Sequence, residues 1–182
     1  MTGSVLYTVG HSDRPLAGLV ELLSAAGIAT LVDVRAQPQS RRHPQFSESS
    51  LRGACDHNGM VYHWAGRQLG GRRPVRGDSP HTMLEEGLRG FADYMQTDAF
   101  QRAATQLRSM AGRGATAIMC AERDPARCHR SLIADYLTLQ GTRVVHLIDL
   151  GRTHEHQLRS EARRESAALI YDRHGTGSLV PE

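Results

Sequence analysis

Short apolar runs alternate along the chain with stretches in which apolar residues recur every three or four positions. The runs have the length expected of buried β-strands, and the recurring positions are typical of helices that bury one face. Strands are predicted at residues 5–9, 28–34, 60–64, 115–120 and 143–150. Helices are predicted at residues 16–23, 47–58, 84–112 (as one or two helices), 132–140 and 155–171. Strands that alternate with helices indicate an α/β fold.

These elements are expected to form a single Rossmann-like domain, in which helices flank a mostly parallel sheet. Residues 1–151 make up this domain, whereas residues 152–182 are predicted to hold an amphipathic helix, residues 155–171, and a loose tail from Gly175. A long loop rich in arginine and glycine interrupts the pattern between Arg67 and Pro80. A loop of this length inside a small domain is usually functional or disordered.

The clearest unit is the strand, loop and helix of residues 115–140. Its apolar run ends at Cys120, and the residues from Arg123 to Arg127 carry three charges and a proline, which a central strand does not tolerate. The following helix stops at Gly141, a typical C-cap residue. In an open parallel sheet the ligand crevice lies where strands end and helices begin, so this loop is the first candidate for a site.

Polar residues also follow the first two predicted strands. His11 and Ser12 follow the first strand, and Asp33, Arg35 and Arg41 end or follow the second. Two strands that bracket a helix form a unit whose strands run parallel. Because parallel strands that end together share one edge, these side chains are predicted to meet the loop after residue 120.

Composition narrows the class of protein. No apolar run approaches the length that spans a bilayer, and no charged and apolar leader is seen, so no membrane partner and no export are expected. Three cysteines are an odd number and too few for a disulfide scaffold, which favours a reducing cytoplasm. The formal net charge is +3, and all basic residues are arginine. Clustered arginines suit phosphate or carboxylate.

Several short motifs occur in one order between Leu6 and Leu147. They are Thr8-Val9-Gly10-His11-Ser12; Leu31-Val32-Asp33-Val34-Arg35 with Pro38, Ser40 and Arg41; Phe46; Leu69-Gly70-Gly71; Phe91-Ala92-Asp93-Tyr94-Met95; and Met119-Cys120-Ala121-Glu122 through Cys128-His129-Arg130. With these motifs the chain resembles the bacterial and archaeal family catalogued as domain of unknown function 488. The resemblance implies a Rossmann-like α/β fold in which the motifs meet at one face, and it implies no particular reaction.

Cys128 is the first candidate for a catalytic residue. It precedes the first turn of a predicted helix, and Arg127, His129 and Arg130 flank it. A helix N-terminus and nearby cations favour a thiolate, so Cys128 is predicted to be a nucleophile or a metal ligand. The alternative is a small buried residue that packs the start of the helix. Cys120 ends an apolar strand and is assigned to structural support.

The two cysteines also suggest metal or redox chemistry together with His11 and His129. Their spacing is not the C-x-x-C of redox proteins, and it misses the usual spacings of structural zinc sites. No metal ligand set is therefore assigned, and the sequence requires no cofactor. A metal or thiol sensor that uses Cys120, Cys128 and His129 is kept as an alternative.

Glu122 and Asp33 are the acidic candidates. Glu122 fits a general base or a structural ion pair with Arg35, Arg41 or Arg130, and these two roles are left open. Asp33 at a strand end is expected to be an arginine partner or an N-cap rather than a catalytic group.

His11 and His129 are candidates for acid–base catalysis, because histidine titrates near neutral pH. Ser12 can donate to a phosphate or cap the next helix, and capping is preferred. His43 and His63 have no partner that the sequence identifies.

Arg35, Arg41 and Arg130 are predicted to bind phosphate, because three arginines from separate motifs at one sheet edge give a positive pocket. Backbone N–H groups before a helix would bind the same anion. Three further arginines of the long loop either close over a polyanion or stay solvated: Arg72, Arg73 and Arg76.

Three functions follow from these residues. The preferred hypothesis is an enzyme acting on a phosphate-bearing substrate, a nucleotide or nucleic acid, with Cys128, His11, His129 and Glu122 as its reactive groups. The alternatives are a non-catalytic nucleic-acid-binding module and the metal or thiol sensor. The sequence contains no P-loop, no G-x-G-x-x-G turn and no G-x-S-x-G elbow, which argues against those enzyme classes. The oligomeric state is left open.

Overall fold

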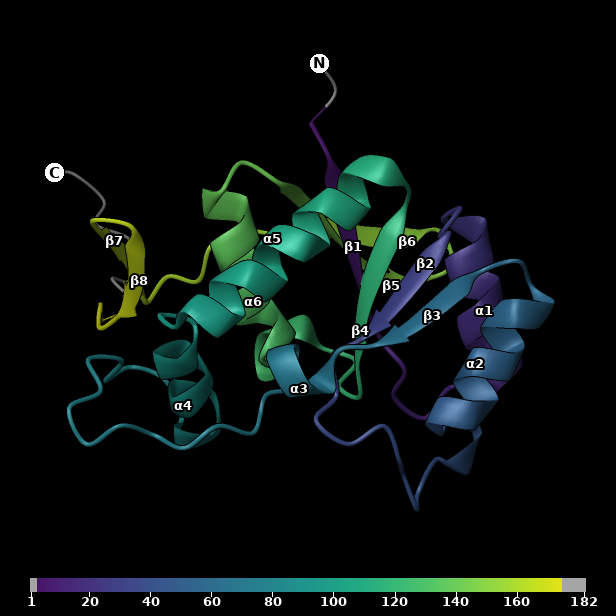
Figure 1. Ribbon diagram of the computed structural model, residues 1–182, viewed down its shortest axis with the longest axis horizontal. Helices are drawn as coiled ribbons and strands as arrows, with labels where there is room; N and C mark the ends of the chain where they lie inside the picture. The colour runs from purple at the N-terminus through teal and green to yellow at the C-terminus, as the bar shows by residue number, and fades with distance from the viewer. Residues whose placement is uncertain (1–2, 175–182) are drawn as a thin grey trace, which may run out of the picture.

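The computed structural model describes residues 3–174 and contains a six-stranded sheet. Its strands are β1 Val5–Gly10, β2 Thr30–Asp33, β3 Val61–Trp64, β4 Thr116–Cys120, β5 Arg143–Asp149 and β6 Arg152–Glu155, and their spatial order is β3-β2-β4-β1-β5-β6 (Figure 1). Strands β1 to β5 run parallel, and β6 runs antiparallel to β5. The predicted α/β fold with a mostly parallel sheet is confirmed.

Helices cover both faces of the sheet (Figure 1). On one face lie α1 Leu16–Ala25 and α2 Glu48–His57; on the other lie α5 Asp98–Arg113 and α6 Arg130–Leu139, preceded in the chain by the shorter α3 Gly66–Leu69 and α4 Glu86–Tyr94. Short 3-10 turns occur at Pro44–Phe46 and Pro125–Arg127. No helix among the described residues is both long and apolar enough to cross a membrane.

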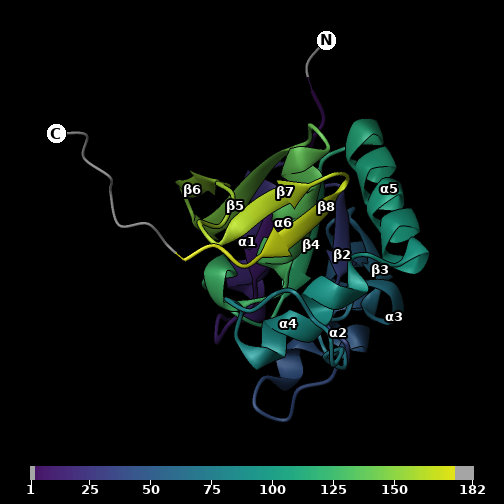
Figure 2. The ribbon, with the colours of Figure 1, turned by 90° about the vertical axis from the view of Figure 1, so that its left-hand side faces the viewer.

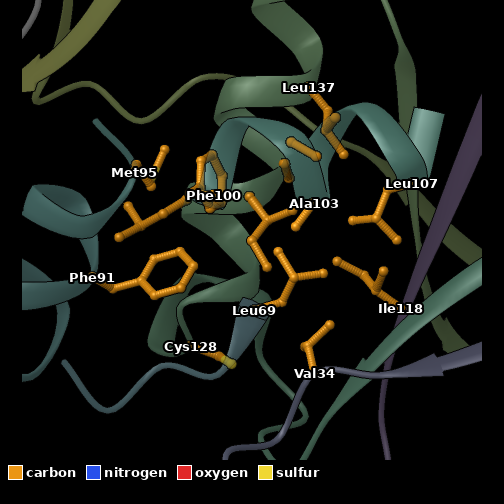
Figure 3. Close-up of a cluster of buried hydrophobic side chains, with 14 of the residues drawn as sticks. Val34, Leu69, Phe91, Met95, Phe100, Ala103, Leu107, Ile118, Cys128 and Leu137 are labelled. Carbon is orange, nitrogen blue, oxygen red and sulfur yellow. The ribbon is translucent and has the colours of Figure 1, made fainter. Parts of the chain in front are cut away.

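Alternating strand residues feed two hydrophobic cores. Leu31 and Met119 point into the core under α1 and α2, whereas Val32 and Ile118 belong to the core under α5 and α6. Figure 3 shows the second core, with Cys128 at its border beside the side chains of the labelled core residues. Both faces of the sheet are buried in this way, which explains why its central strand β4 is buried along its whole length.

The ends of the helices follow local sequence signals. The side chain of Thr97 accepts a hydrogen bond from the backbone N–H of Phe100 at 3.3 Å and so caps the start of α5. Gly141 follows α6 with a φ of +82°, a conformation that glycine adopts without steric cost. The predicted stop at this glycine is therefore confirmed.

The helical connections that follow β1 and β4 lie on opposite faces of the sheet. Strands β1 and β2 are parallel, as expected of the first unit, but β4 lies between them. The chain leaves β1 through α1 on one face and leaves β4 through α6 on the other. Such a switch point opens a crevice at the carboxyl ends of the two strands. The fold thus places the strongest site candidates at the expected position.

The C-terminal segment differs from the prediction. Residues 155–171 do not form an amphipathic helix; the chain makes the edge strand β6 and then a hairpin of β7 Ala162–Glu165 and β8 Ala168–Tyr171. Figure 2 shows this hairpin lying over α6, and Leu169 and Tyr171 join the core beneath it. The loose tail expected from Gly175 lies outside the described residues.

A buried chain of hydrogen bonds fastens this segment to the sheet. Tyr171 donates to Asp135 of α6 at 2.9 Å, and the other Asp135 oxygen lies 2.7 Å from Nε2 of His156. His156 Nδ1 lies 2.9 Å from His146 Nε2, and His146 Nδ1 lies 2.6 Å from the Thr8 hydroxyl. With neutral rings, the carboxylate fixes the order of the chain because it only accepts: each Nε2 donates, and Thr8 donates to His146.

Tyr171→Phe is expected to lower the free energy of unfolding by about 1 to 2 kcal/mol, because it removes one donor from a buried carboxylate. Urea denaturation measures this loss. Tyr136→Phe is the matched control: Tyr136 lies half-buried on the same helix as Asp135, and its hydroxyl has no described hydrogen bond. Equal stability of the two variants would show that the Asp135 contact does not hold the hairpin.

Candidate functional site

A cleft of about 1200 Å³ opens at the carboxyl edge of the sheet, at the switch point between β1 and β4. The loops after β1, β2 and β4 line it, and residues 71–75 and 85–88 form its remaining wall. The long loop between α3 and α4 therefore contributes directly to the cleft. Among the predicted site residues, the structure brings His11, Ser12, Arg35, Cys120, Glu122, Cys128 and His129 to this lining.

A buried ion pair supports the floor. Arg35 donates to Asp33 through Nε at 2.9 Å and through Nη2 at 2.6 Å, while Tyr62 donates to the same carboxylate at 2.6 Å. Asp33 is completely buried, and the two groups neutralise one another. Burial and the adjacent Asp33 carboxylate raise the pKa of Tyr62, which stays a hydrogen-bond donor. The prediction of Asp33 as an arginine partner is confirmed.

His11 is held by two fixed partners. Its Nδ1 lies 2.8 Å from the Ser12 carbonyl, which only accepts, so Nδ1 carries the proton. Nε2 then accepts from Arg35 Nη1 at 3.3 Å, and the ring stacks on Phe46 with centroids 4.4 Å apart. Burial lowers the pKa of His11 to about 4. At neutral pH His11 is uncharged with both nitrogens engaged, so it orients Arg35, and neither nitrogen is free to act as a base.

His129 is oriented in the opposite sense. Its Nε2 lies 3.1 Å from the Val34 carbonyl and 2.9 Å from the Leu69 carbonyl, so Nε2 carries the proton. The free lone pair on Nδ1 faces the Cys128 sulfur at 3.3 Å. Burial lowers the pKa of His129 to about 4, which keeps the ring neutral. His129 is therefore arranged to accept a proton from Cys128.

The thiols of Cys120 and Cys128 influence each other. The Cys120 thiol raises the pKa of Cys128, and burial adds to this effect. Burial alone would raise the pKa of Cys120, but the hydrogen bond from Cys128 and the charge of Arg130 outweigh it and lower that pKa. The lowered pKa expected for the Cys128 thiol is therefore wrong, because its pKa is raised. A helix N-terminus and flanking arginines do not compensate for burial there.

Arg130 does not line the cleft, and its assignment to phosphate binding does not fit its position. The side chain is completely buried; its Nη1 donates to the Glu122 carbonyl at 2.7 Å and its Nη2 donates to the Arg123 carbonyl at 2.9 Å. Arg130 thus braces the loop after β4 from within. The Glu122 carboxylate is exposed at the cleft and pairs with none of the arginines proposed for it among the described residues. Its role as a general base stays a prediction.

Two glycines allow these groups to approach. A Cβ atom on Gly10 would lie 1.8 Å from the Glu122 carbonyl oxygen and 2.8 Å from Arg130 Nη1. A Cβ atom on Gly71 would lie 2.6 Å from His129 Nδ1. Any larger residue at either position would displace the loop after β4 or the imidazole.

Ser12 also departs from its preferred role. Helix α1 begins at Leu16 behind Pro15, and no side chain caps it. The Ser12 hydroxyl instead donates to Asp13 at 3.2 Å, and its backbone has a φ of +49°. Ser12 is thus turned into the cleft lining, where anion binding by its hydroxyl stays a prediction.

The side chains of three arginines at the rim of the cleft have no described ion-pair or hydrogen-bond partner. Arg42, Arg72 and Arg127 are exposed and come from three separate loops. Arg41, which sequence reasoning preferred, is exposed but does not line the cleft, whereas its neighbour Arg42 does. Because Arg41 and Arg42 are adjacent and identical, the sequence does not indicate which of them lines the cleft.

The other loop arginines are already engaged. Arg73 donates to the Gly70 carbonyl at 3.0 Å and its guanidinium lies 3.7 Å from the centre of the Tyr94 ring. Arg76 pairs with Asp78 and does not line the cleft. Arg73 therefore fixes the loop, and Arg72 is the residue of this run that stays available.

Carboxylates line the cleft as well. Besides Glu122 they are Asp13, Glu85 and Glu86, and they nearly balance the lining arginines. The cleft as a whole therefore has little of the predicted net positive charge, and positive charge is concentrated around the arginines without a described partner. Within residues 3–174 no group of three or more His, Cys, Asp or Glu side chains is arranged to hold a metal ion.

Sequence reasoning missed Arg42, Arg127 and His43 as parts of the lining. Arg127 follows the short turn before α6, and its proximity to Cys128 was a usable signal. His43 lies with its ring 6.1 Å from His11, a contact that depends on the fold of the loop after β2. His63 lies on the edge strand β3, away from the cleft.

Comparisons with known proteins agree with this architecture only at the level of a family. Searches of the curated proteins and of the solved structures give no match. The family described as Domain of unknown function DUF488 matches residues 15–137, which include the loops after β2 and β4 that line the cleft. The chain belongs to the DUF488 family.

Proposed function

We propose that this protein is an enzyme that acts on a phosphate-bearing substrate, a nucleotide or nucleic acid. One observation carries the proposal: Arg42, Arg72 and Arg127 converge from three separate loops on one cleft without a described carboxylate partner. Guanidinium groups match phosphate oxygens in geometry and charge. Arg35 supports the same role, because four of its five N–H groups are engaged and one on Nη1 is left for a ligand.

The floor of the cleft supplies reactive groups. The Cys120 and Cys128 thiols are nucleophiles, and His129 Nδ1 is placed to accept the Cys128 proton. The exposed carboxylate of Glu122 is suited to activate water or a substrate hydroxyl. All of these reactive groups lie in the cleft. His11 is no longer assigned as a base, and it supports Arg35 instead.

The size and lining of the cleft bear on the substrate. Its volume of about 1200 Å³ is larger than most small-molecule pockets and accommodates a nucleotide or a short oligonucleotide. No Phe, Tyr or Trp occurs in the lining, so base stacking contributes little. Recognition is expected to depend on phosphate and sugar groups more than on the base.

The triple variant Arg42→Ala, Arg72→Ala, Arg127→Ala is expected to bind phosphate-bearing ligands at least about tenfold more weakly, because charge-assisted hydrogen bonds are lost. Isothermal titration with pyrophosphate, nucleoside monophosphates and short single-stranded DNA and RNA measures the change. Arg108→Ala on α5 is the matched control, since Arg108 is exposed, has no described partner and lies outside the lining. Equal affinities of the triple variant and the control would contradict the proposal.

Turnover separates an enzyme from a binding module. Ligands that bind are incubated with the protein and their products are separated by chromatography; Glu122→Gln is expected to abolish conversion while leaving the thermal unfolding temperature unchanged. Binding that falls steeply with salt but yields no product under any condition would instead support the non-catalytic nucleic-acid module.

A further inference from the structure

Arg130 is a buried cation without a carboxylate. Its side chain is completely buried, and no Asp or Glu among the described residues lies within ion-pair distance of it. Guanidinium does not lose its proton in proteins, so the charge is present at every working pH. A buried charge without a compensating partner is strongly unfavourable. Some other group must therefore carry the balancing negative charge.

Within residues 3–174, the Cys120 sulfur is the one ionisable group bound to this guanidinium. Arg130 Nη1 donates to Cys120 Sγ at 2.9 Å, and the remaining bonds of the guanidinium go to neutral carbonyl oxygens. Nε of Arg130 is buried without a partner, so no further acceptor shares the charge. The lowered pKa of Cys120 points the same way. The hydrogen bond from Arg130 therefore favours the ionised form of Cys120.

Cys128 provides the second sulfur. It lies with Cys120 in the lining of the cleft and keeps its proton, since the neighbouring Cys120 raises its pKa. The two side chains come from opposite ends of one loop, at the end of β4 and just before α6. Both cysteines are largely buried, but both belong to the wall of the open cleft, from which a small oxidant would approach them. Cys55, in contrast, is buried in the core under α1 and α2, where burial raises its pKa to about 11.

We propose that Cys120 and Cys128 form a peroxide-reactive dithiol that closes to a disulfide, an activity separate from the binding of phosphate at the rim. The Cys120 thiolate attacks the terminal oxygen of a hydroperoxide, the O–O bond breaks, and the alkoxide leaves and takes a proton, giving a sulfenic acid. The Cys128 thiol then attacks the sulfur of that acid. Its proton leaves with the hydroxyl group as water, and a disulfide remains. The peroxide is reduced by two electrons and the two thiols are oxidised by two.

The number of thiols after exposure to hydrogen peroxide tests the proposal. The protein is treated with increasing peroxide, unfolded in N-ethylmaleimide and analysed by mass spectrometry. Alkylation is expected to fall from three thiols to one, with a single linked peptide pair that contains residues 120 and 128, and dithiothreitol should restore all three thiols. Retention of three thiols, or a linkage that includes Cys55, would overturn the proposal.

Single variants identify which sulfur reacts first. Cys128→Ser is expected to accumulate a sulfenic acid on Cys120 that a 1,3-diketone reagent traps, whereas Cys120→Ser should leave Cys128 unoxidised at the same peroxide dose. Cys55→Ser serves as the control and should form the disulfide at the normal rate. Oxidation of Cys128 in the Cys120→Ser variant would show that Cys120 is not the sulfur that reacts first.

Two variants, one without and one with a positive charge at position 130, test the role of Arg130. Arg130→Met is expected to slow disulfide formation at pH 7 at least about tenfold, because the thiolate loses its counter-charge. Arg130→Lys keeps the charge and should retain most of the rate. If the Arg130→Met variant does not fold, the rate at which iodoacetamide labels Cys120 in Cys128→Ser is measured against pH instead. A rate that stays constant well below pH 8 supports a resting thiolate. A rate that rises only above pH 8 refutes it.

Discussion

Replacement of Asp33 by alanine is expected to lower the free energy of unfolding by about 3 to 5 kcal/mol, the largest loss predicted for a single substitution in this protein. The carboxylate is completely buried and accepts from the Arg35 backbone, the Arg35 guanidinium and the Tyr62 hydroxyl. Without it, the permanently charged Arg35 stays buried with no carboxylate partner. Urea denaturation followed by circular dichroism measures the loss.

Two further variants separate the charge from the hydrogen bonds. Tyr62→Phe removes one neutral donor and should cost about 1 kcal/mol. The double variant Asp33→Ala, Arg35→Met should recover a large part of the stability, because no charge is left unpaired. If the single Asp33→Ala variant loses less than Tyr62→Phe, the ion pair does not hold the floor of the cleft.

Acid is expected to destabilise the protein between about pH 6.5 and pH 4, before most carboxylates take up protons. Burial lowers the pKa of His11 and His129 to about 4 and that of His146 to about 3. In the unfolded chain these rings titrate near pH 6.5 and therefore bind more protons than the native protein in this range. The stabilisation is present above pH 6.5 and is lost as the pH falls toward the native values.

The slope of stability against pH measures the effect. Each of the three rings contributes about 1.4 kcal/mol per pH unit near pH 5, where it is charged only in the unfolded state. His146→Gln retains groups that can bond to Thr8 and His156, and should reduce the slope by about one such contribution. His57→Gln is the control, because His57 is exposed on α2. An unchanged slope in His146→Gln would contradict the origin assigned to it.

Strands β1 to β5 were predictable because each contains an apolar run, whereas the exposed, polar strand β6 was not predicted. The unit from β4 to α6 is the clearest case, with a charged, proline-containing loop between two apolar elements and Gly141 after the helix. The hairpin of β7 and β8 was not predictable in the same way. Its two-residue turn is Ser166-Ala167, without the glycine or asparagine that usually marks such turns, and its arginines and glutamates suit a helix.

The position of the candidate site could be predicted from the sequence, but the roles of its residues could not. Strand ends bring His11, Arg35 and Cys120 to one edge, as their positions in the sequence indicate. The direction of a side chain at the first turn of a helix is decided by packing, so the sequence did not reveal that Arg130 points inward. The same holds for the two thiols: their mutual hydrogen bond and Arg130 lower the pKa of Cys120, while Cys120 and burial raise that of Cys128.

The central position of β1 constrains how the protein is made. Strand β1 lies between β4 and β5, so both of its partners are synthesised more than 100 residues after it. At about 5 to 20 residues per second, the apolar segment from Val5 to Gly10 waits on the order of 5 to 20 seconds on the ribosome before either partner exists. Such distant pairings also slow folding, because long loops must close first. The nascent chain therefore presents an unpaired, aggregation-prone strand during most of its synthesis.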